Sequence, residues 1–225
     1  MKPKFPESLV PRVPPRILLG PGPSNSNQRV LDVMSGPMIG YLDPDFMKIL
    51  DEISGLLRMV FQTDSSLTMA ISGTGSAGME AGINSFLEPD DTVLICVCGF
   101  FGRRMVDMAE RVGANVVVLE SDWGKPFPPE LLEDAISKHR AVKMVTAVQG
   151  ETSTGIFQPL GEMSLLARQN DALFMVDAVT SLGGSNVNVD KLDIDYCYSA
   201  TQKCLGCPPG LSPVAISDRA QKILS

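Results

Sequence analysis

A lysine and an aspartate each follow a short apolar run, and their side chains could act together in catalysis. Lys203 lies just beyond the run 194–198, and Asp177 directly follows the run 172–176. A lysine amine forms a Schiff base with an aldehyde, and a carboxylate pairs with a protonated ring nitrogen. The pair therefore indicates chemistry on a ring that carries an aldehyde and a basic nitrogen. Taken singly, each residue is more often a solvated loop lysine or a helix-capping aspartate.

A glycine-rich loop, SGTGS at residues 72–76, separates a predicted strand at 67–71 from a predicted helix that runs to residue 86. Glycines let the backbone approach an anion, hydroxyls donate hydrogen bonds, and a helix N-terminus offers free N–H groups. The loop lacks the GxxxxGK(S/T) pattern and matches the dinucleotide pattern GxGxxG only weakly. It is a candidate phosphate site, and a tight packing turn is the alternative.

Two further loops at predicted strand ends complete the set. Phe101 lies in GFFG at residues 99–102. An aromatic side chain there can stack on a planar ring, although such a residue more often belongs to the core. Residues 149–155 (QGETSTG) supply three hydroxyls and two glycines, which suit either contacts with a ligand or turn capping. Open α/β sheets bind ligands at the carboxyl ends of their strands. The loops that carry the glycine-rich turn, Phe101, Asp177 and Lys203 together hold the parts that a phosphorylated pyridine requires.

The composition limits the classes of protein to which the chain can belong. Its 225 residues suffice for one large domain or two small ones. A net charge of −7 and a pI near 4.7 argue against nucleic-acid binding. The sequence has no run of about 20 apolar residues to span a membrane. Prolines at positions 3, 6, 11, 14 and 15 indicate an extended arm rather than a signal peptide, so we expect a cytoplasmic protein, with organelle import as the alternative.

The five cysteines favour structural thiols over a disulfide framework. Cys96 and Cys98 lie two residues apart in a predicted strand, so they share one face. Cys204 and Cys207 form a CxxC motif, which could be redox-active or half of a zinc site. No second CxxC accompanies it, and His139 is the only histidine. Because structural zinc needs four ligands, we expect no metal site.

Short strands rich in Val, Ile and Leu alternate with helices along the chain. This pattern predicts an α/β fold with a mostly parallel sheet that is covered by helices on both faces. The predicted strands are at residues 67–71, 92–98, 115–119, 142–148, 172–176, 194–199 and 212–217. The predicted helices are at residues 30–34, 45–61, 73–86, 101–112, 130–138 and 160–168, with another that begins at 217–218.

Several motifs in this order resemble those of the class V aminotransferases of fold-type I, nearest the alanine–glyoxylate and serine–pyruvate (serine–glyoxylate) group. They are GPGPSN at 20–25, SGTGS at 72–76, GETSTG at 150–155, VDAV at 176–179, and TQK at 201–203 with PPG at 208–210. The resemblance runs from about residue 17 to the end of the sequence. It implies that pyridoxal 5′-phosphate (PLP) is the cofactor.

The resemblance also implies roles for individual residues. Lys203 would be the Schiff-base lysine and would move the proton between substrate and cofactor, and Asp177 would hold the pyridine nitrogen. Phe101 stands where the family usually stacks a tryptophan on the ring. Binding residues are implied at the cofactor phosphate (Thr74, Gly75, Ser76 and Gln202), at the ring hydroxyl (Thr152) and in the substrate pocket (Gly22 and Asn25).

We divide the chain into an extended arm at residues 1–24 and a PLP-binding large domain at residues 25–225. The family's small C-terminal domain, with the arginine that binds the substrate carboxylate, has no counterpart here, so we expect a truncated chain. We expect it to bind the cofactor weakly and to have little or no activity. The resemblance further implies a homodimer with shared sites, and we expect the arm to cross the partner subunit.

The expected function is transfer of an amino group from alanine or serine to glyoxylate or pyruvate, so the partners are small amino acids and 2-oxo acids. A ureidoglycine–glyoxylate aminotransferase is the close alternative. Tyr41 disfavours it weakly, because relatives with that activity tend to place an amide residue nearby. A cysteine desulfurase would need a reactive cysteine on a mobile loop. A non-catalytic PLP-binding or regulatory subunit and a CxxC redox protein are further alternatives.

Overall fold

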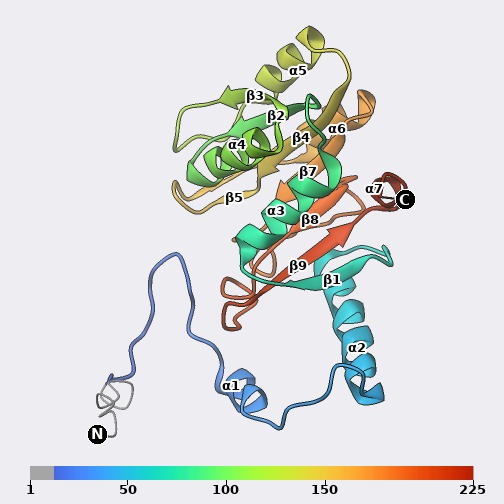
Figure 1. Cartoon of the computed structure of the whole chain (residues 1–225). Coiled ribbons are helices and arrows are strands. Elements are labelled where there is room, and N and C mark those ends of the chain that lie inside the picture. Colours follow the sequence, from blue (N-terminus) through green and yellow to red (C-terminus); the bar gives the residue numbers. More distant parts are fainter. Residues whose placement is uncertain (1–12, 225) are drawn as a thin grey trace, which may run out of the picture.

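A mixed β-sheet forms the centre of the computed structural model, which describes residues 13–224 (Figure 1). Within that range the sheet has seven strands in the order β1-β9-β8-β7-β4-β2-β3. They are β1 (Thr68–Ser72), β2 (Thr92–Val97), β3 (Asn115–Glu120), β4 (Val142–Val148), β7 (Leu173–Asp177), β8 (Tyr196–Tyr198) and β9 (Leu211–Ile216). Strand β9 is antiparallel to both of its neighbours, and the other neighbours are parallel, which confirms the predicted sheet type.

Helices cover both faces of the sheet, as predicted. Their bounds are α1 (Gln28–Met34), α2 (Pro44–Phe61), α3 (Gly75–Phe86), α4 (Phe100–Val112), α5 (Pro129–Lys138), α6 (Gly161–Gln169) and α7 (Asp218–Gln221). The buried residues of α3 and α4 belong to one apolar cluster, and those of α5 and α6 belong to the cluster on the opposite face. The loop at 149–155 differs from the prediction, because it contains part of a small hairpin, β5 (Gly150–Glu151) with β6 (Ile156–Phe157).

The alternation of side chains along the strands explains why these runs are apolar throughout. In β2, the side chains of Val93, Ile95 and Val97 enter the cluster with α3 and α4. The intervening Leu94 and Cys96 enter the cluster with α5 and α6. Successive strand residues point to opposite faces, so a strand that is covered on both sides has no solvent-facing position for a polar residue.

Helix α3 packs very closely on the sheet because small residues line its inner face. A Cβ atom added to Gly78 would lie 2.1 Å from Ser212 Oγ on β9. At the start of the helix, a Cβ atom on Gly75 would lie 3.0 Å from the Cβ of Ala200, in the loop after β8. This close approach brings the first turn of α3 to the carboxyl end of β8.

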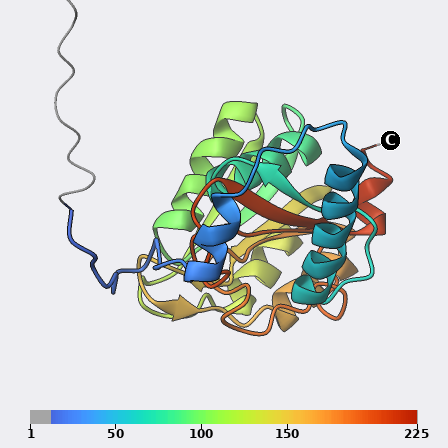
Figure 2. The same cartoon turned by 90° about the horizontal axis from the view of Figure 1, so that it is seen from below.

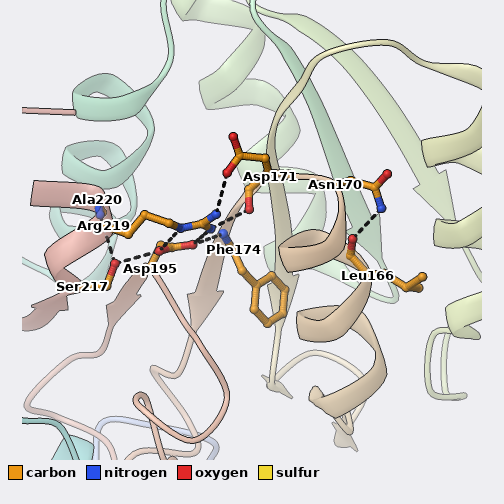
Figure 3. A network of polar contacts seen from close by, with 9 residues as sticks. Leu166, Asn170, Asp171, Phe174, Asp195, Ser217, Arg219 and Ala220 are labelled. Atoms are coloured by element: carbon orange, nitrogen blue, oxygen red, sulfur yellow. Dashed lines mark hydrogen bonds and ion pairs between the residues drawn. The ribbon is translucent and has the colours of Figure 1, made fainter. Parts of the chain in front are cut away.

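A partly buried ion pair between Arg219 and Asp195 holds α7 against the amino-terminal ends of the central strands (Figure 3). The side chain of Asp195, just before β8, accepts hydrogen bonds from Ser217 Oγ (2.7 Å) and Arg219 Nε (3.0 Å). Arg219 Nη2 also donates to Ala172 O (2.7 Å). A cavity of about 320 Å³ beside this network contains none of the predicted site residues. We therefore interpret the network as structural.

Strand β8 is shorter than the predicted strand at 194–199. The reason lies before Tyr196, where the backbone N–H of Ile194 donates to Val189 O (3.0 Å) instead of to a neighbouring strand. Asp193 also has a positive φ of 45°, which is incompatible with an extended strand. Residues 194–198 are largely apolar, with Asp195 as the exception, so hydrophobicity did not indicate where the strand begins.

The segment before α2 lies on the outside of the sheet and its helix layers (Figures 1 and 2). Residues 13–27 form neither helix nor strand, and α1 has no buried residue. The part of the predicted arm at residues 1–12 lies outside the described residues. Across residues 13–224, none of the helices has both the length and the apolar character needed to cross a bilayer.

Candidate active site

The sheet topology gathers most of the predicted site residues around one cavity. In the parallel pairing, Val148 of β4 lies beside Asp177 of β7, which lies beside Tyr198 of β8. The carboxyl ends of these strands therefore meet at one edge, next to the first turn of α3. The cavity there has a volume of about 210 Å³ and is lined by Thr74, Gly75, Ser76, Met79, Phe101, Arg104, Asp177, Val179, Tyr198, Gln202 and Lys203.

Asp177 is held as a buried carboxyl group at the end of β7. Its Oδ1 accepts a hydrogen bond from the backbone N–H of Val179 (2.8 Å), and its Oδ2 accepts one from the hydroxyl of Tyr198 (2.6 Å). Burial raises the pKa of Asp177 to about 6, although the bonds from Tyr198 and Val179 lower it. A carboxylate in such a site favours a cationic partner strongly, because little water competes for it.

Tyr198 is a residue that the sequence analysis missed. Its ring is fully buried and its hydroxyl contacts Asp177, although it was interpreted only as part of an apolar run. A buried tyrosine hydroxyl needs a hydrogen-bond partner. The sequence did contain a signal for this contact: a tyrosine ends one apolar run, and an aspartate directly follows the preceding one.

Lys203 lies against the N-terminal segment. Its Nζ donates to Pro21 O (2.6 Å), and its backbone carbonyl accepts from Ser24 Oγ (3.1 Å). A Cβ atom on Gly22 would lie 2.6 Å from Lys203 Nζ, and Gly22 has a φ of +137° that other residues rarely adopt. The predicted substrate-pocket residue Gly22 is therefore in contact with the lysine, although it does not line the cavity.

Two other predicted residues lie outside the cavity lining. Asn25 Oδ1 accepts from the backbone N–H of Leu18 (2.7 Å), and its Nδ2 donates to Arg16 O (3.0 Å), so its side chain folds the arm. Thr152 Oγ1 shares a short hydrogen bond with Thr180 Oγ1. The contacts with substrate and with the ring hydroxyl that were expected of these two residues stay predictions.

Helix α4 contributes both an aromatic ring and an arginine to the cavity. Arg104 Nη1 donates to Ser76 Oγ (3.1 Å), and its guanidinium carbon lies 5.2 Å from the centroid of the Phe101 ring. Arg103 is exposed and pairs with Glu120, whereas Arg104 is half-buried and lines the cavity. Consecutive helical residues point about 100° apart, so one arginine faces solvent and the next faces the cavity.

Glu151 contacts the backbone of Phe101, and the sequence analysis missed this role as well. Its side chain is 1% exposed. Its Oε2 accepts from the backbone N–H groups of Phe101 (3.1 Å) and Gly102 (3.4 Å), and its Oε1 accepts from the N–H of Ser153 (3.0 Å). A carboxylate at this point satisfies N–H groups of the first turn of α4 and is favoured by the helix dipole.

The cysteines do not form a second centre. Burial raises the pKa values of the Cys96 and Cys197 thiols far above their ordinary value, which makes them poor nucleophiles. The thiols of the CxxC motif are free, and Cys204 Sγ donates to Thr180 O (3.3 Å). Over the residues that the structure describes, no group of three or more His, Cys, Asp or Glu is arranged to hold a metal ion.

The polar groups of the cavity match a phosphorylated pyridine. Asp177 and Tyr198 provide a carboxylate for a ring nitrogen. The start of α3 provides an anion site, and the Thr74 side chain makes no capping hydrogen bond there. Among the described residues, Gln202 Oε1 is a buried atom without a hydrogen-bond partner, in the lining of the same cavity. A buried acceptor that lacks a partner is costly, so a ligand that donates a hydrogen bond to this oxygen would be stabilised there.

Comparison with known proteins identifies the class. The family model described as aminotransferase class-V matches residues 18–225, so the chain belongs to the class V aminotransferases, a PLP-dependent family. Its fold is the large α/β domain of fold-type I. The resemblance found in the sequence motifs is thereby confirmed.

Individual relatives carry two different activities. The chain is 43% identical to the (S)-ureidoglycine–glyoxylate transaminase of Bacillus subtilis, over 94% of this chain and 51% of that protein. It is 41% identical to the alanine–glyoxylate aminotransferase of Drosophila melanogaster, over 92% of this chain and 53% of that protein. A crystal structure of alanine–glyoxylate aminotransferase from Nostoc sp. superposes with a TM-score of 0.91 at 46% identity, over 98% of this chain and 60% of that chain. The chain thus spans about half the length of the curated relatives it matches.

Proposed function

We propose that this chain is the cofactor-binding part of an aminotransferase that uses PLP bound at Lys203. The observation that carries the proposal is the single cavity in which Lys203, Asp177 and the first turn of α3 meet. When bound, PLP supplies an aldehyde that bonds to amines and a ring that accepts electrons. The proposed domain division is an arm at residues 1–24 and a PLP-binding domain at residues 25–225.

The residues of the chain would divide the work as follows. Lys203 Nζ binds the cofactor aldehyde and, when free, accepts and returns the proton at the α-carbon of the substrate. Asp177, in its ionised form, holds the pyridine nitrogen protonated, and Tyr198 orients that carboxylate through the hydrogen bond of 2.6 Å. Phe101 stacks on the ring. The remaining cofactor contacts are assigned to Thr74, Gly75, Ser76, Thr152 and Gln202.

The proposed reaction is transfer of an amino group from alanine or serine to glyoxylate or pyruvate, with Gly22 and Asn25 beside the substrate. Relatives named as alanine–glyoxylate aminotransferases support this choice. A ureidoglycine–glyoxylate transaminase is the second candidate, favoured by the 43% identity to the Bacillus subtilis relative. The side chain of Tyr41 is 76% exposed and lines none of the cavity, so its position does not decide between them.

The N-terminal segment supports a homodimer. Large apolar side chains on it are strongly exposed: Ile17 (81%), Leu19 (91%), Val33 (81%), Met38 (98%) and Leu42 (79%). Monomeric proteins rarely expose apolar surface on this scale, so such surface marks a site of association. We assign its occupant as a second copy of this chain.

The test of the proposal is covalent trapping of the cofactor. The 225-residue chain is incubated with PLP, reduced with borohydride and digested, and the peptides are mapped by mass spectrometry. A pyridoxyl group should be found on the peptide that contains Lys203, because its amine lines the cavity. Lys203→Ala should lose the label yet retain noncovalent PLP. Lys191→Ala, which changes an exposed lysine, is the matched control and should be labelled like the parent.

Labelling at a different lysine, or equal labelling of Lys203→Ala and the parent, would refute the assignment. Amino transfer to glyoxylate is then measured with alanine, serine and (S)-ureidoglycine as donors, in this chain and in one extended to the length of the relatives. The donor with the highest kcat/KM identifies the reaction. Label on Lys203 with no transfer from any donor in either chain would favour the non-catalytic alternative.

A further inference from the structure

We propose that Arg104 is a positioning residue for the cofactor phosphate, an inference that rests on the proposed function. Arg104 would orient the hydroxyl of Ser76 as a donor and would add positive charge at that end of the cavity. The sequence motifs and the family comparison assign no role to this arginine. Three features of the structure carry the inference: the contact with Ser76, the distribution of charge in the cavity and the aromatic support of the guanidinium.

The contact with Ser76 fixes the direction of a hydrogen bond. Arg104 Nη1 lies 3.1 Å from Ser76 Oγ. A guanidinium group has donors only, whereas a hydroxyl has one proton and two acceptor sites. Ser76 Oγ must therefore accept from Arg104, and its own proton is left to be donated elsewhere. Because Ser76 lines the cavity in the first turn of α3, an anion at that turn is the natural acceptor.

The carboxylate of Asp177 and the guanidinium of Arg104 enter the cavity lining from different elements. Asp177, at the end of β7, would repel a phosphate and attract a ring nitrogen. Arg104, on α4 next to the first turn of α3, carries a positive charge at any ordinary pH. In a partly buried site the attraction between a guanidinium and a phosphate is stronger than in water. The phosphate is therefore expected beside Ser76 and Arg104, away from Asp177.

Two aromatic rings hold the guanidinium in place. Its carbon lies 5.0 Å from the centroid of the Phe100 ring and 5.2 Å from that of the Phe101 ring, within the range of cation–π attraction. The rings themselves meet edge to face at 5.5 Å. A guanidinium supported in this way loses less conformational entropy when it binds an anion. The alternative is that Arg104 merely packs on these rings and has no effect on the phosphate.

The two explanations differ in a binding measurement that needs no turnover. Equilibrium dialysis gives the affinities of the 225-residue chain for PLP and for pyridoxal, which lacks the phosphate. Arg104→Gln should weaken PLP binding by about tenfold or more and change pyridoxal binding by less than about threefold, as expected for loss of a charge-assisted contact. Arg103→Gln, at the exposed neighbouring position, is the matched control and should bind both compounds like the parent.

Two further variants guard against ambiguous results. Arg104→Lys keeps the charge and should give an intermediate ratio of the two affinities, which covers the case that Arg104→Gln does not fold. Ser76→Ala combined with Arg104→Gln should lose less PLP affinity than the sum of the two single losses, because Arg104 acts partly through Ser76. Thermal unfolding of each variant checks that it is folded.

The outcomes separate this inference from the proposed function. Equal losses of PLP and pyridoxal affinity in the Arg104 variants would show a packing role and overturn the inference, while binding at Lys203 would still stand. Unchanged PLP affinity in Arg104→Gln would overturn it as well. A parent chain that binds neither compound would overturn both proposals.

Discussion

At the scale of a single residue, Asp177 is suited to a charged ligand, and its buried carboxyl group destabilises the chain when no ligand is bound. Burial raises the pKa of this carboxyl group from 3.8 to about 6. Between these values the folded chain binds more protons than the unfolded chain, so stability falls as the pH rises from about 4 to about 6. Above pH 6 the ionised carboxylate costs about 3 kcal/mol. The same charge is what a pyridinium ring would neutralise.

We predict that Asp177→Asn stabilises the cofactor-free chain at pH 8 by about 1–3 kcal/mol relative to the parent, while near pH 4 the two are similar. The amide can keep both hydrogen bonds, because it accepts from Val179 and donates to the Tyr198 oxygen. Urea unfolding between about pH 4 and pH 8 measures the difference. Asp51→Asn, which changes an exposed carboxylate on α2, is the matched control.

A difference between Asp177→Asn and the parent that stayed constant with pH would contradict the assignment of the cost to ionisation. The variant should also bind PLP more weakly, because the ring nitrogen loses its anionic partner. Greater stability together with weaker cofactor binding would identify Asp177 as a residue that is retained for the ligand rather than for the fold.

At the scale of the element, the start of α4 depends on a carboxylate from a loop fifty positions away in sequence. Glu151 Oε2 accepts from the N–H of Phe101, with a sequence separation of 50, and also from that of Gly102. The hairpin formed by β5 and β6 contains Glu151 and places its carboxylate behind the helix. The orientation of the Phe101 ring in the cavity thus depends on a contact between β5 and the first turn of α4.

We predict that Glu151→Gln lowers the free energy of unfolding by about 1–3 kcal/mol, because an amide nitrogen cannot accept from the N–H groups that a carboxylate oxygen satisfies. Urea unfolding measures the change. Glu162→Gln alters an exposed acid in the first turn of α6 and serves as the matched control, with an expected change within about 0.5 kcal/mol. Equal effects of the two substitutions would show that Glu151 contributes no more than an exposed helix-end charge.

At the scale of the whole molecule, the exposed apolar segment before and within α2 is the basis of the proposed homodimer. Helix α1 buries none of its residues, and α2 buries only Phe61, although both carry large apolar side chains. A single chain therefore leaves much apolar surface of this segment in water. Each 100 Å² of apolar surface that a partner covers contributes about 2.5 kcal/mol to the hydrophobic free energy of association. The arm that is expected to cross a partner subunit comprises residues 1–24, of which residues 1–12 lie outside the described range.

We predict a dimer at micromolar concentration in sedimentation velocity. Met38→Glu combined with Leu42→Glu should shift it toward monomer, because each substitution would bury a carboxylate in an apolar contact. Leu165→Glu, at a 55% exposed position on α6, is the matched control and should leave the dimer intact. A monodisperse monomer of the parent chain, or dissociation by Leu165→Glu as well, would contradict a dimer through the N-terminal segment.

From the amino-acid sequence alone, the fold class could be predicted, and so could the candidate site residues whose chemistry allows few substitutes. Continuous apolar runs predicted a sheet that is covered on both faces. The candidate site could be predicted because the proposed chemistry requires an amine, a carboxylate and a glycine-rich turn, which Lys203, Asp177 and the loop 72–76 supply. The contacts of Tyr198, Arg104 and Glu151 became evident only in the tertiary structure. Local sequence patterns indicate a core residue for Tyr198, a solvated residue for Arg104 and a loop residue for Glu151. Their contacts join distant segments, with Arg104 and Ser76 separated by 28 positions and Tyr198 and Asp177 by 21. Periodicity and residue type report local conformation, whereas the direction of a side chain toward another element is decided by how the elements pack.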